Sequence, residues 1–436
     1  MIQLQIESQA SIPKRRWRIA WLLGLGVLVN YFDRVNLSVS HDSLYAAFGI
    51  SNIAFGYLSA AYNWTYALCQ LPIGVVLDRF GVRRIGRISS FIWSISTFGA
   101  AITPTLGGLF AARLALGVGE APTFPANAKA IGYWFPESER SLATAIFDGA
   151  AKFASAIGVP LIGIVLLWVG WRWSFAITGV VSFLYFLLFW MVYRDPGDDP
   201  ALSALERRYI EGEAPASTAP AKPDSLGYLL RQRKVIGLAV GMGSYNYVFY
   251  LLLTWLPSYL SMVLHVDLLH SVLYTSLPWL FAGLLNLLVG GWLVNTLIQR
   301  GWNTSRVRRF ILIGGTICGL GLVGAANPHS ARQALIWISI SIGGLSAASP
   351  VGWSLPSLIA RKENVGKVGG IVNFSNQLSG IAAPIATGYL VTARQSFALA
   401  FGLPVIYLAV GIAAYIFLLG RIELPMEPEE RRNVLS

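Results

Sequence analysis

The sequence predicts an all-α membrane protein whose twelve transmembrane helices form two pseudo-symmetric bundles of six. The first indication is composition, because 55% of the residues are hydrophobic and only 12% are charged, whereas an ordinary soluble domain has about 25% charged residues. The second is length, because six consecutive charge-free intervals in the second half each exceed the roughly 20 residues that a spanning helix needs. The third is that the first half divides in the same way.

The predicted spans follow one another with charged or turn-rich boundaries. In the first half they cover residues 17–40, 53–77, 86–104, 107–134, 141–168 and 171–193. In the second half they cover residues 235–266, 268–299, 310–331, 333–360, 368–393 and 395–420. The stretch between them is rich in Pro, Asp, Glu, Ser and Arg, as polar linkers are. The predicted domains are therefore a six-helix bundle at 1–193, a cytoplasmic linker at 194–234 and a second six-helix bundle at 235–436.

The placement of lysine and arginine predicts the orientation, since short cytoplasmic loops of membrane proteins are enriched in both. With both termini in the cytoplasm, most of the 33 lysines and arginines fall on that side, and the outer side holds only Arg172, Arg332 and Arg394. We therefore expect a multi-pass protein of the cell (inner) membrane with both termini cytoplasmic. This distribution also accounts for the net charge of +12, so no nucleic-acid partner is expected.

Seven ionisable side chains lie inside predicted spans of the first half. They are Asp33, Arg34, Arg113, Glu120, Lys129, Asp148 and Lys152. A charge near the bilayer centre costs about 2.5 to 3.5 kcal/mol on insertion scales, so such a residue usually faces the bundle interior and marks a substrate or ion pathway. The pattern favours a transporter. Nothing in the sequence indicates an enzyme, a bound cofactor, a metal site or a nucleotide-binding P-loop, so an ion gradient is the expected energy source.

The loop after the second predicted span reads GVVLDRFGVRR at residues 74–84. It resembles the G-x-x-x-D-R-x-G-x-R-R signature of the major facilitator superfamily. We interpret it as a conformational latch that does not touch substrate, in which the acid pairs with basic groups at a helix end and the glycines permit close helix approach and a tight turn. The latch residues are Gly74, Asp78, Arg79, Gly81, Arg83 and Arg84.

A degraded copy of this signature lies at the equivalent place in the second half, where GGWLVN at residues 290–295 precedes Arg300 and Gly301. Asn295 stands in the place of the acid. Two related halves are therefore predicted. Transporters built from such repeats bind substrate near the bilayer midplane between the halves and expose it to each side by rocking.

Further segments resemble the anion:cation symporter family, which includes permeases for sugar acids and aromatic acids and the relatives of sialin. The similar segments are NYFDRVNLS at 30–38, RLALG at 113–117 with Glu120 and Pro125, WFPESER at 134–140, TWLPSYL at 254–260 and GGIVNF at 369–374. The resemblance implies that Asp33 and Glu120 serve in proton coupling and that Arg113 contacts substrate.

Helix geometry allows these charges to form one cluster. Arg113 and Glu120 are seven residues apart, hence on nearly the same helix face and roughly 10 Å apart along the axis, and Asp33 lies at a depth similar to Arg113. We hypothesise that Arg113 pairs with Glu120 in the empty site. An anionic substrate then takes over the arginine, and the released carboxylate becomes easier to protonate. The alternative is an interhelical salt network, including Arg34, that only holds the bundle together.

Two lysines have competing interpretations. Asp148 and Lys152 have the i, i+4 spacing of a pair on one helix face. They either neutralise each other or separate so that Lys152 meets a substrate carboxylate, and the sequence leaves both open. Lys129, near the inner end of its span, is expected to snorkel toward the membrane surface.

Uncharged residues complete the candidate substrate site. In the first half, Tyr31 and Tyr66 lie near the charged layer. A tyrosine in a packed helix is more often a core residue, but the resemblance to sugar-acid permeases makes both candidates beside Arg34. In the second half no charge is expected to face the site, so recognition there falls to amides and aromatic residues. The candidates are Asn246, Tyr250, Trp353, Asn373 and Asn376.

The sequence thus predicts a proton-coupled symporter of a small organic anion, with a sugar acid as the favoured substrate. Its expected partners are that substrate, a proton and the lipid bilayer, and a monomer is the default oligomeric state. Two alternatives stay open, an exchanger of two organic anions and a membrane sensor without net transport, because a fold alone does not settle function. The acid carried, and sodium as a coupling ion, are not decided by the sequence.

Overall fold

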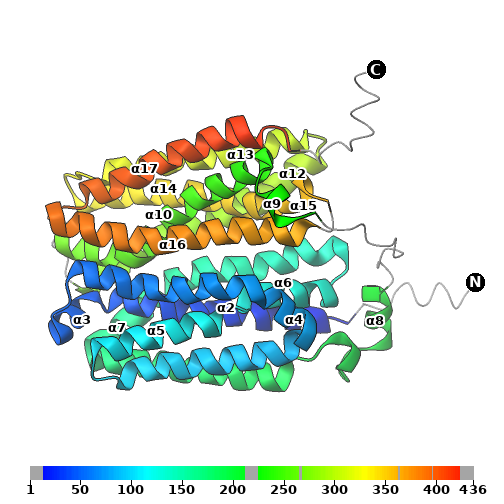
Figure 1. Cartoon of the computed structure of the whole chain (residues 1–436), viewed down its shortest axis with the longest axis horizontal. Helices are drawn as coiled ribbons and strands as arrows, with labels where there is room; N and C mark the ends of the chain where they lie inside the picture. The colour runs from blue at the N-terminus through cyan, green and yellow to red at the C-terminus, as the bar shows by residue number, and fades with distance from the viewer. Residues whose placement is uncertain (1–12, 212–223, 265–267, 362–363, 395, 423–436) are drawn as a thin grey trace, which may run out of the picture.

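The computed structural model describes residues 13–211, 224–264, 268–361, 364–394 and 396–422. Within these ranges the chain is almost entirely helical and contains no β-strand. Long helices run side by side along the longest axis of the molecule (Figure 1). The predicted all-α fold is confirmed.

The first half consists of long helices, two of which contain a turn. Its elements are α2 (Arg15–Val39), α3 (His41–Phe48), α4 (Asn52–Ile102), α5 (Leu106–Glu120), α6 (Thr123–Trp134) and α7 (Glu137–Val192). Within α4 the backbone leaves helical geometry at Gly81, where φ is 77°, and within α7 it does so at Gly170, where φ is 81°. Glycine is favoured at both positions because a side chain resists positive φ. The chain turns back at each, so α4 and α7 each supply two spans.

The second half follows three short elements, η1 (Pro196–Asp198), α8 (Ala204–Glu211) and α9 (Leu226–Leu229). Its α-helices are α10 (Arg233–Leu264), α11 (Leu268–Leu285), α12 (Val294–Gln299), α13 (Thr304–Gly319), α14 (Ala331–Ser354), α15 (Pro356–Ile359), α16 (Val365–Arg394) and α17 (Ala398–Ala413). Tighter or wider turns continue three of them, π-helical η2 (Asn286–Leu293), 3₁₀-helical η3 (Leu320–Ala325) and π-helical η5 (Ala414–Leu419).

Within the described ranges, seven helices are long and apolar enough to cross a membrane, or up to eight if the bent pair His41–Phe48 and Asn52–Gln70 counts as one span. The α7 helix counts once here although it holds two spans. The others fall short because α5 has only 15 residues and because buried polar residues such as Asp33 and Arg34 lower the hydropathy of α2. Counting each segment of α4 and α7 separately, the helices give the twelve predicted spans.

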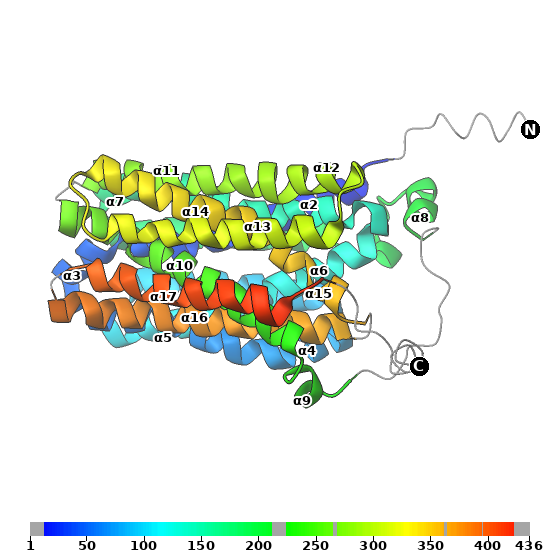
Figure 2. The same ribbon diagram turned by 90° about the horizontal axis from the view of Figure 1, so that it is seen from above.

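The two halves pack against each other mainly through three pairs of helices. The α4 helix contacts α16, α7 contacts α11, and α2 contacts α10. The start of α2, the end of η5 and α8 all lie at one end of the molecule, and α3 lies at the opposite end (Figures 1 and 2). We refer to these as the α8 end and the α3 end.

The segment between the halves does more than connect them. Arg15 pairs with Asp199 at 2.8 Å, and Arg16 pairs with Glu206 of α8 at 3.0 Å and with Glu139 at the start of α7 at 2.6 Å. Since Asp199 and Glu206 are almost fully buried, these ion pairs fasten the segment to the first bundle. Its composition predicted a polar linker and gave no sign of this packing.

Candidate functional site

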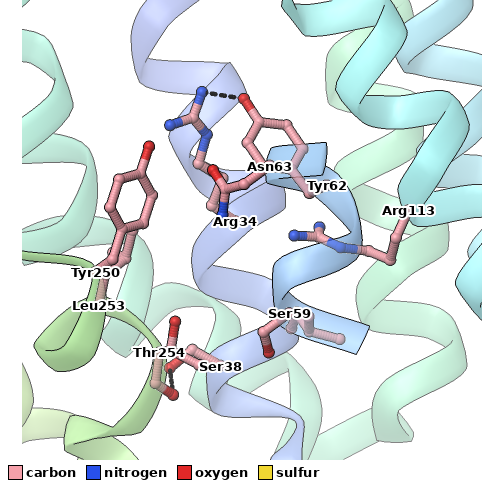
Figure 3. A pocket seen from close by; sticks show the side chains of 10 residues that line it. Arg34, Ser38, Ser59, Tyr62, Asn63, Arg113, Tyr250, Leu253 and Thr254 are labelled. Carbon is pink, nitrogen blue, oxygen red and sulfur yellow. Dashed lines mark hydrogen bonds between the residues drawn. The ribbon is translucent and has the colours of Figure 1, made fainter. Parts of the chain in front are cut away.

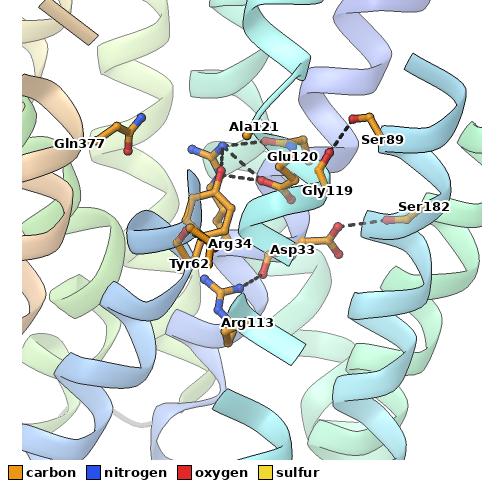
Figure 4. A network of polar contacts seen from close by, with 12 residues as sticks. Asp33, Arg34, Tyr62, Ser89, Arg113, Gly119, Glu120, Ala121, Ser182 and Gln377 are labelled. Carbon is orange, nitrogen blue, oxygen red and sulfur yellow. Dashed lines mark hydrogen bonds and ion pairs between the residues drawn. The ribbon is translucent and has the colours of Figure 1, made fainter. Parts of the chain in front are cut away.

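An ion pair between two helices forms the centre of the site (Figure 4). Arg34 of α2 lies with Nη2 3.2 Å and Nε 3.3 Å from Oε2 of Glu120, the last residue of α5. Nη2 also donates to Oδ1 of Asn30 at 2.9 Å and to the hydroxyl of Tyr62. Both charged side chains are buried, Glu120 completely. A buried charge needs such partners, because an unpaired one carries a large desolvation penalty.

Three tyrosine rings surround the Arg34 guanidinium. Its carbon lies 4.4 Å from the ring centre of Tyr31, 4.6 Å from that of Tyr62 and 5.7 Å from that of Tyr66. Cations are attracted to the faces of aromatic rings at such distances. Two of these tyrosines are predicted site residues, and the structure brings both to the arginine.

A hollow of about 320 Å³, including the part open to solvent, lies beside this ion pair and between the two halves (Figure 3). The hollow is lined by Arg34, Leu37, Ser38, Ser59, Tyr62, Asn63, Arg113, Tyr250, Leu253 and Thr254. Its charged lining residues are two arginines, and its remaining polar groups are hydroxyls, an amide and main chain. This combination suits a small anion that carries hydrogen-bonding groups.

The structure contradicts the expected pairing of Arg113 with Glu120. Instead, Nη1 of Arg113 lies 3.5 Å from the main-chain oxygen of Asp33, and its guanidinium carbon lies 5.4 Å from the ring centre of Tyr62. Seven residues of helix separate Arg113 and Glu120 by about 10 Å along the axis. Arg34 of α2 reaches the Glu120 carboxylate from the facing helix and forms the ion pair that was expected of Arg113.

Asp33 faces a different environment from Glu120. Its Oδ2 accepts a hydrogen bond of 3.1 Å from Ser182 in the second segment of α7 (Figure 4). Asp33 is buried and does not line the hollow. The two predicted proton-coupling acids therefore lie in the same bundle but point to different neighbours.

Three more of the charged residues, Asp148, Lys152 and Lys129, lie outside the hollow. Lys152 donates to Oδ2 of Asp148 at 2.8 Å, with side-chain exposures of 4% and 18%. The pairing that the i, i+4 spacing allowed is present. Lys129 is half-buried and donates to the main-chain oxygen of Leu77 at 3.0 Å, so its amine contacts α4, and the expected snorkelling stays a prediction.

Of the candidates in the second half, only Tyr250 lines the hollow, where its hydroxyl donates to Oε1 of Gln377 at 3.4 Å. The amide of Asn246 donates to the carbonyl of Met242 in its own helix at 3.0 Å. Trp353 is 40% exposed. Asn246 and Trp353 do not line the hollow, because their positions on the helices point their side chains away from it.

The two asparagines of α16 also lie outside the hollow. Nδ2 of Asn373 donates to Oε1 of Gln70 in α4 at 3.1 Å and so joins the two halves. Asn376 is buried, and neither of its side-chain polar atoms has a hydrogen-bond partner among the described residues. A buried amide needs hydrogen-bond partners, and a ligand bound in another conformation of the protein could supply them to Asn376.

Three lining residues of α4 were not predicted from the sequence, namely Ser59, Tyr62 and Asn63. Together with Tyr66 they have the spacing i, i+3, i+4, i+7, which places them on one helix face. A polar stripe of this kind in an apolar span is the signal that could have identified them.

The structure agrees with only part of what was predicted for the latch residues. Gly81 forms the expected turn. A Cβ at Gly74 would meet no described atom within 4 Å, so the close approach expected there is not seen among the described residues and stays a prediction. Arg83 reaches Asp198 of η1 at 3.5 Å, and the guanidinium of Arg79 lies 5.3 Å from the ring centre of Phe80. The side chain of Asp78 lies outside the described part of the chain, and Arg84 is exposed.

Contacts at the α3 end join the two halves above the hollow. The ring of His41 lies 4.5 Å from that of Phe55 and 5.7 Å from that of Trp255. Ser38 donates to the carbonyl of Thr254 at 2.8 Å. The hollow is therefore covered on this side by side chains from α2, α3, α4 and α10.

A proline creates a further bond between the halves. Pro384 lies inside α16 and has no N–H, so the carbonyl of Gly380 has no helical donor. Nδ2 of Asn63 donates to that carbonyl at 2.9 Å. A Cβ on Gly56 would lie 2.6 Å from the carbonyl oxygen of Pro384, so the helices approach closely here.

The chain matches known proteins along nearly its whole length. The model of the Major Facilitator Superfamily matches residues 23–384. The chain belongs to this superfamily. It is 37% identical to the uncharacterized transporter YybO of Bacillus subtilis, over 94% of the chain and 95% of the relative. It is 30% identical to the D-galactonate transporter of Escherichia coli O6:H1, over 96% of the chain and 99% of the relative.

A solved structure of the same superfamily shows the same fold. The inward-facing, unoccupied form of a bacterial homolog of the human lysosomal transporter Spinster superimposes with a TM-score of 0.74 at 18% identity, over 94% of this chain and 98% of that one. These relatives are all transporters, so this chain is a multi-pass membrane transporter and not an enzyme. The predicted resemblance to the superfamily and to its sugar-acid permeases is confirmed.

Proposed function

We propose that this major facilitator protein is a proton-coupled symporter that carries a small organic anion, a sugar acid, by alternating access. The observation that carries the proposal is the buried Arg34–Glu120 pair beside a hollow between the halves, with Arg113 as a second cation. A carboxylate entering the hollow can replace Glu120 at Arg34, because the guanidinium binds either one.

The coupling follows from burial. When the substrate carboxylate takes Arg34, Glu120 is left in a completely buried position without its cationic partner. Burial disfavours the charged form of a carboxyl, so Glu120 binds a proton. Substrate and proton then occupy the site together, and rocking of one bundle against the other carries both across. Relative to the sequence-based hypothesis, Arg34 takes the role that was assigned to Arg113.

The neutral lining supports a polyhydroxylated substrate. Ser59, Tyr62 and Asn63 from α4 and Tyr250 from α10 offer hydroxyl and amide groups around the two arginines. One relative at 30% identity is a D-galactonate transporter, and galactonate combines one carboxylate with several hydroxyls. A sugar acid fits this lining better than a purely apolar acid, whose aliphatic body would leave those buried groups unpaired.

The proposal includes location and energy source. The α8 end lies in the cytoplasm, because most lysines and arginines are at that end of the predicted spans. The protein then resides in the cell (inner) membrane with both termini cytoplasmic, works as a monomer, and uses the proton gradient without a bound cofactor. The two bundles at 1–193 and 235–436, with 194–234 between them, are the bodies that rock.

The test is the external pH of lightly buffered proteoliposomes as a panel of sugar acids and aromatic acids is added. Wild type should cause alkalinisation with a sugar acid, and Glu120→Gln should not. Arg231→Gln, in the turn between α9 and α10, is a charge-neutralising control at an exposed residue and should behave as wild type. Accumulation of labelled acid only in vesicles preloaded with a second acid, with no pH change, would show an exchanger instead.

A further inference from the structure

A second hollow lies within the first bundle. It is bounded by the second segment of α4, by α6 and by the second segment of α7, and its space is about 320 Å³ including the part open to solvent. Four of its lining residues carry the inference, namely Trp93, Thr123, Asn127 and Tyr185. None of them lines the hollow between the halves.

Three buried polar atoms gather at this second hollow without a hydrogen-bond partner among the described residues. They are Nε1 of Trp93, Oγ1 of Thr123 and Nδ2 of Asn127. Their side chains are at most 9% exposed. Buried polar groups in proteins are almost always satisfied, and a polar cavity with two to four such groups is the setting that holds ordered water. Water is therefore the ligand that fits.

The hollow ends close to Asp33. The rings of Trp93 and Tyr185 stack, with centroids 5.4 Å apart and planes 6° apart, at one side of it. Ser182 lies three residues, one helical turn, before Tyr185 and donates to Asp33. In the other direction α7 continues from Tyr185 to Val192, whose carbonyl binds Arg15 at the α8 end. The hollow thus lies between Asp33 and the α8 end.

We propose that this hollow is a water-filled chamber that carries protons between Asp33 and the α8 end, on a route separate from that of the substrate. The inference rests on the proton coupling proposed above. Glu120, which binds the proton together with the substrate, passes it to Asp33 and pairs again with Arg34 as the substrate leaves. Asp33 then gives the proton to a water of the chamber, its acid O–H bond breaks, and the carboxylate keeps its hydrogen bond from Ser182. The excess proton passes along the waters to the cytoplasm. The stacked Trp93–Tyr185 pair separates the chamber from Asp33 and opens for each transfer.

The first test removes the polar lining. In the double variant Thr123→Val, Asn127→Leu, gradient-driven uptake of the acid identified by the panel should fall about tenfold. Counterflow of the same acid between equal concentrations should stay within about twofold, because exchange does not require proton release. Thr316→Val is the matched control, since that buried hydroxyl in α13 donates within its own helix. No loss in either assay, or an equal loss in both, would overturn the proposal.

The second test asks whether water reaches the hollow, and it applies even if the double variant fails to fold. In a background without Cys69 and Cys318, Asn127→Cys in detergent should react with methanethiosulfonate ethylammonium, a small water-borne reagent. Ala130→Cys should not react, because Ala130 is fully buried and does not line the hollow. Equal lack of reaction at both cysteines would show a dry hollow and overturn the chamber. Alkalinisation by wild type tests the proposed function separately.

Discussion

Nη2 of Arg34 lies 3.2 Å from Oε2 of Glu120, across 86 residues of sequence and between two helices. The same nitrogen also donates hydrogen bonds to Oδ1 of Asn30 and to the hydroxyl of Tyr62. One guanidinium therefore connects α2, α4 and α5. Any anion that binds this arginine must compete with the carboxylate, which links occupancy of the site to the state of Glu120.

Arg34→Lys should raise the KM for the transported acid at least tenfold. A lysine ammonium cannot bond the carboxylate, amide and hydroxyl in the planar arrangement that the guanidinium uses, and hydrogen bonds to charged groups contribute about 1.5 to 3 kcal/mol each. Initial uptake rates over a range of substrate concentrations measure the effect. Arg113→Lys is the comparison, because the described contacts of the Arg113 guanidinium are a 3.5 Å hydrogen bond to a main-chain oxygen and the ring of Tyr62, with no carboxylate partner within ion-pair distance, and its KM should change less. Equal changes would contradict the central position of Arg34.

Removing both charges of the Asp148–Lys152 pair together should cost little stability and little transport. Asp148→Asn alone leaves a buried lysine uncompensated, which typically costs about 3 to 5 kcal/mol, so its melting temperature in detergent should drop clearly. Asp148→Asn with Lys152→Met should recover most of that loss and transport at a rate near wild type, because Lys152 does not line the hollow. A stable double variant without transport would instead assign Lys152 to the substrate.

Gly81→Ala should destabilise the turn between the two segments of α4. Gly81 has φ 77° and ψ 163°, a backbone conformation that essentially only glycine adopts, and holding another residue there costs about 1 to 3 kcal/mol. Thermal unfolding in detergent should show a lower melting temperature for this variant. Gly74→Ala should melt as wild type, since its Cβ would meet open space. If the two variants melted alike, the positive φ would not be the reason for glycine at position 81.

Gly56→Ala should prevent the halves from closing at the α3 end. The new Cβ would lie 2.6 Å from the main-chain oxygen of Pro384, and a backbone atom cannot move aside as a flexible side chain can. Cysteines in place of Tyr57 and Tyr389, whose hydroxyls lie 3.3 Å apart, should cross-link through a short bismaleimide less efficiently when the alanine is present. Gly107→Ala, which meets no described atom within 4 Å, should leave the yield unchanged.

The network at the α8 end should respond to acid. The hydrogen bond from Arg16 holds the pKa of Glu139 below its usual value. A lowered pKa contributes stability above the unfolded-state value, about 4.3, and that contribution is lost as the pH falls through the folded-state value. The melting temperature should therefore be insensitive to this group from pH 7 to 5 and fall below about pH 4. Glu139→Gln should melt lower at pH 7 and lose less below pH 4. Identical acid profiles would contradict the pairing.

The spans and the charged layer could be predicted because both depend on residue type and spacing alone. Apolar length defines a helix in lipid, and buried charges in it must converge. The partner of Glu120 could not be predicted in this way. Whether Arg34 or Arg113 reaches it depends on the rotation of α2 against α5, which several packing contacts decide together. Which of the candidate side chains bind substrate stays a prediction.

The second bundle shows the same limit. Asn246 satisfies its amide within its own helix, and Asn373 uses its amide to reach Gln70. The sequence shows that a buried amide needs a partner but not which partner it finds. The packing of the segment between the halves was missed for a related reason. Its charged composition is typical of a solvated linker, and composition does not show that Asp199 pairs with Arg15 or that Glu206 of α8 pairs with Arg16.

The bond from Asn63 to the carbonyl of Gly380 requires a particular side chain in one bundle and only main chain in the other. Pro384 makes that oxygen available, whatever residues surround it. The second bundle can therefore exchange neighbouring side chains during evolution, and acquire new substrates, without losing this attachment to the first. Chimaeras that join halves of two relatives should still close, provided that the first bundle keeps the asparagine and the second bundle keeps the proline.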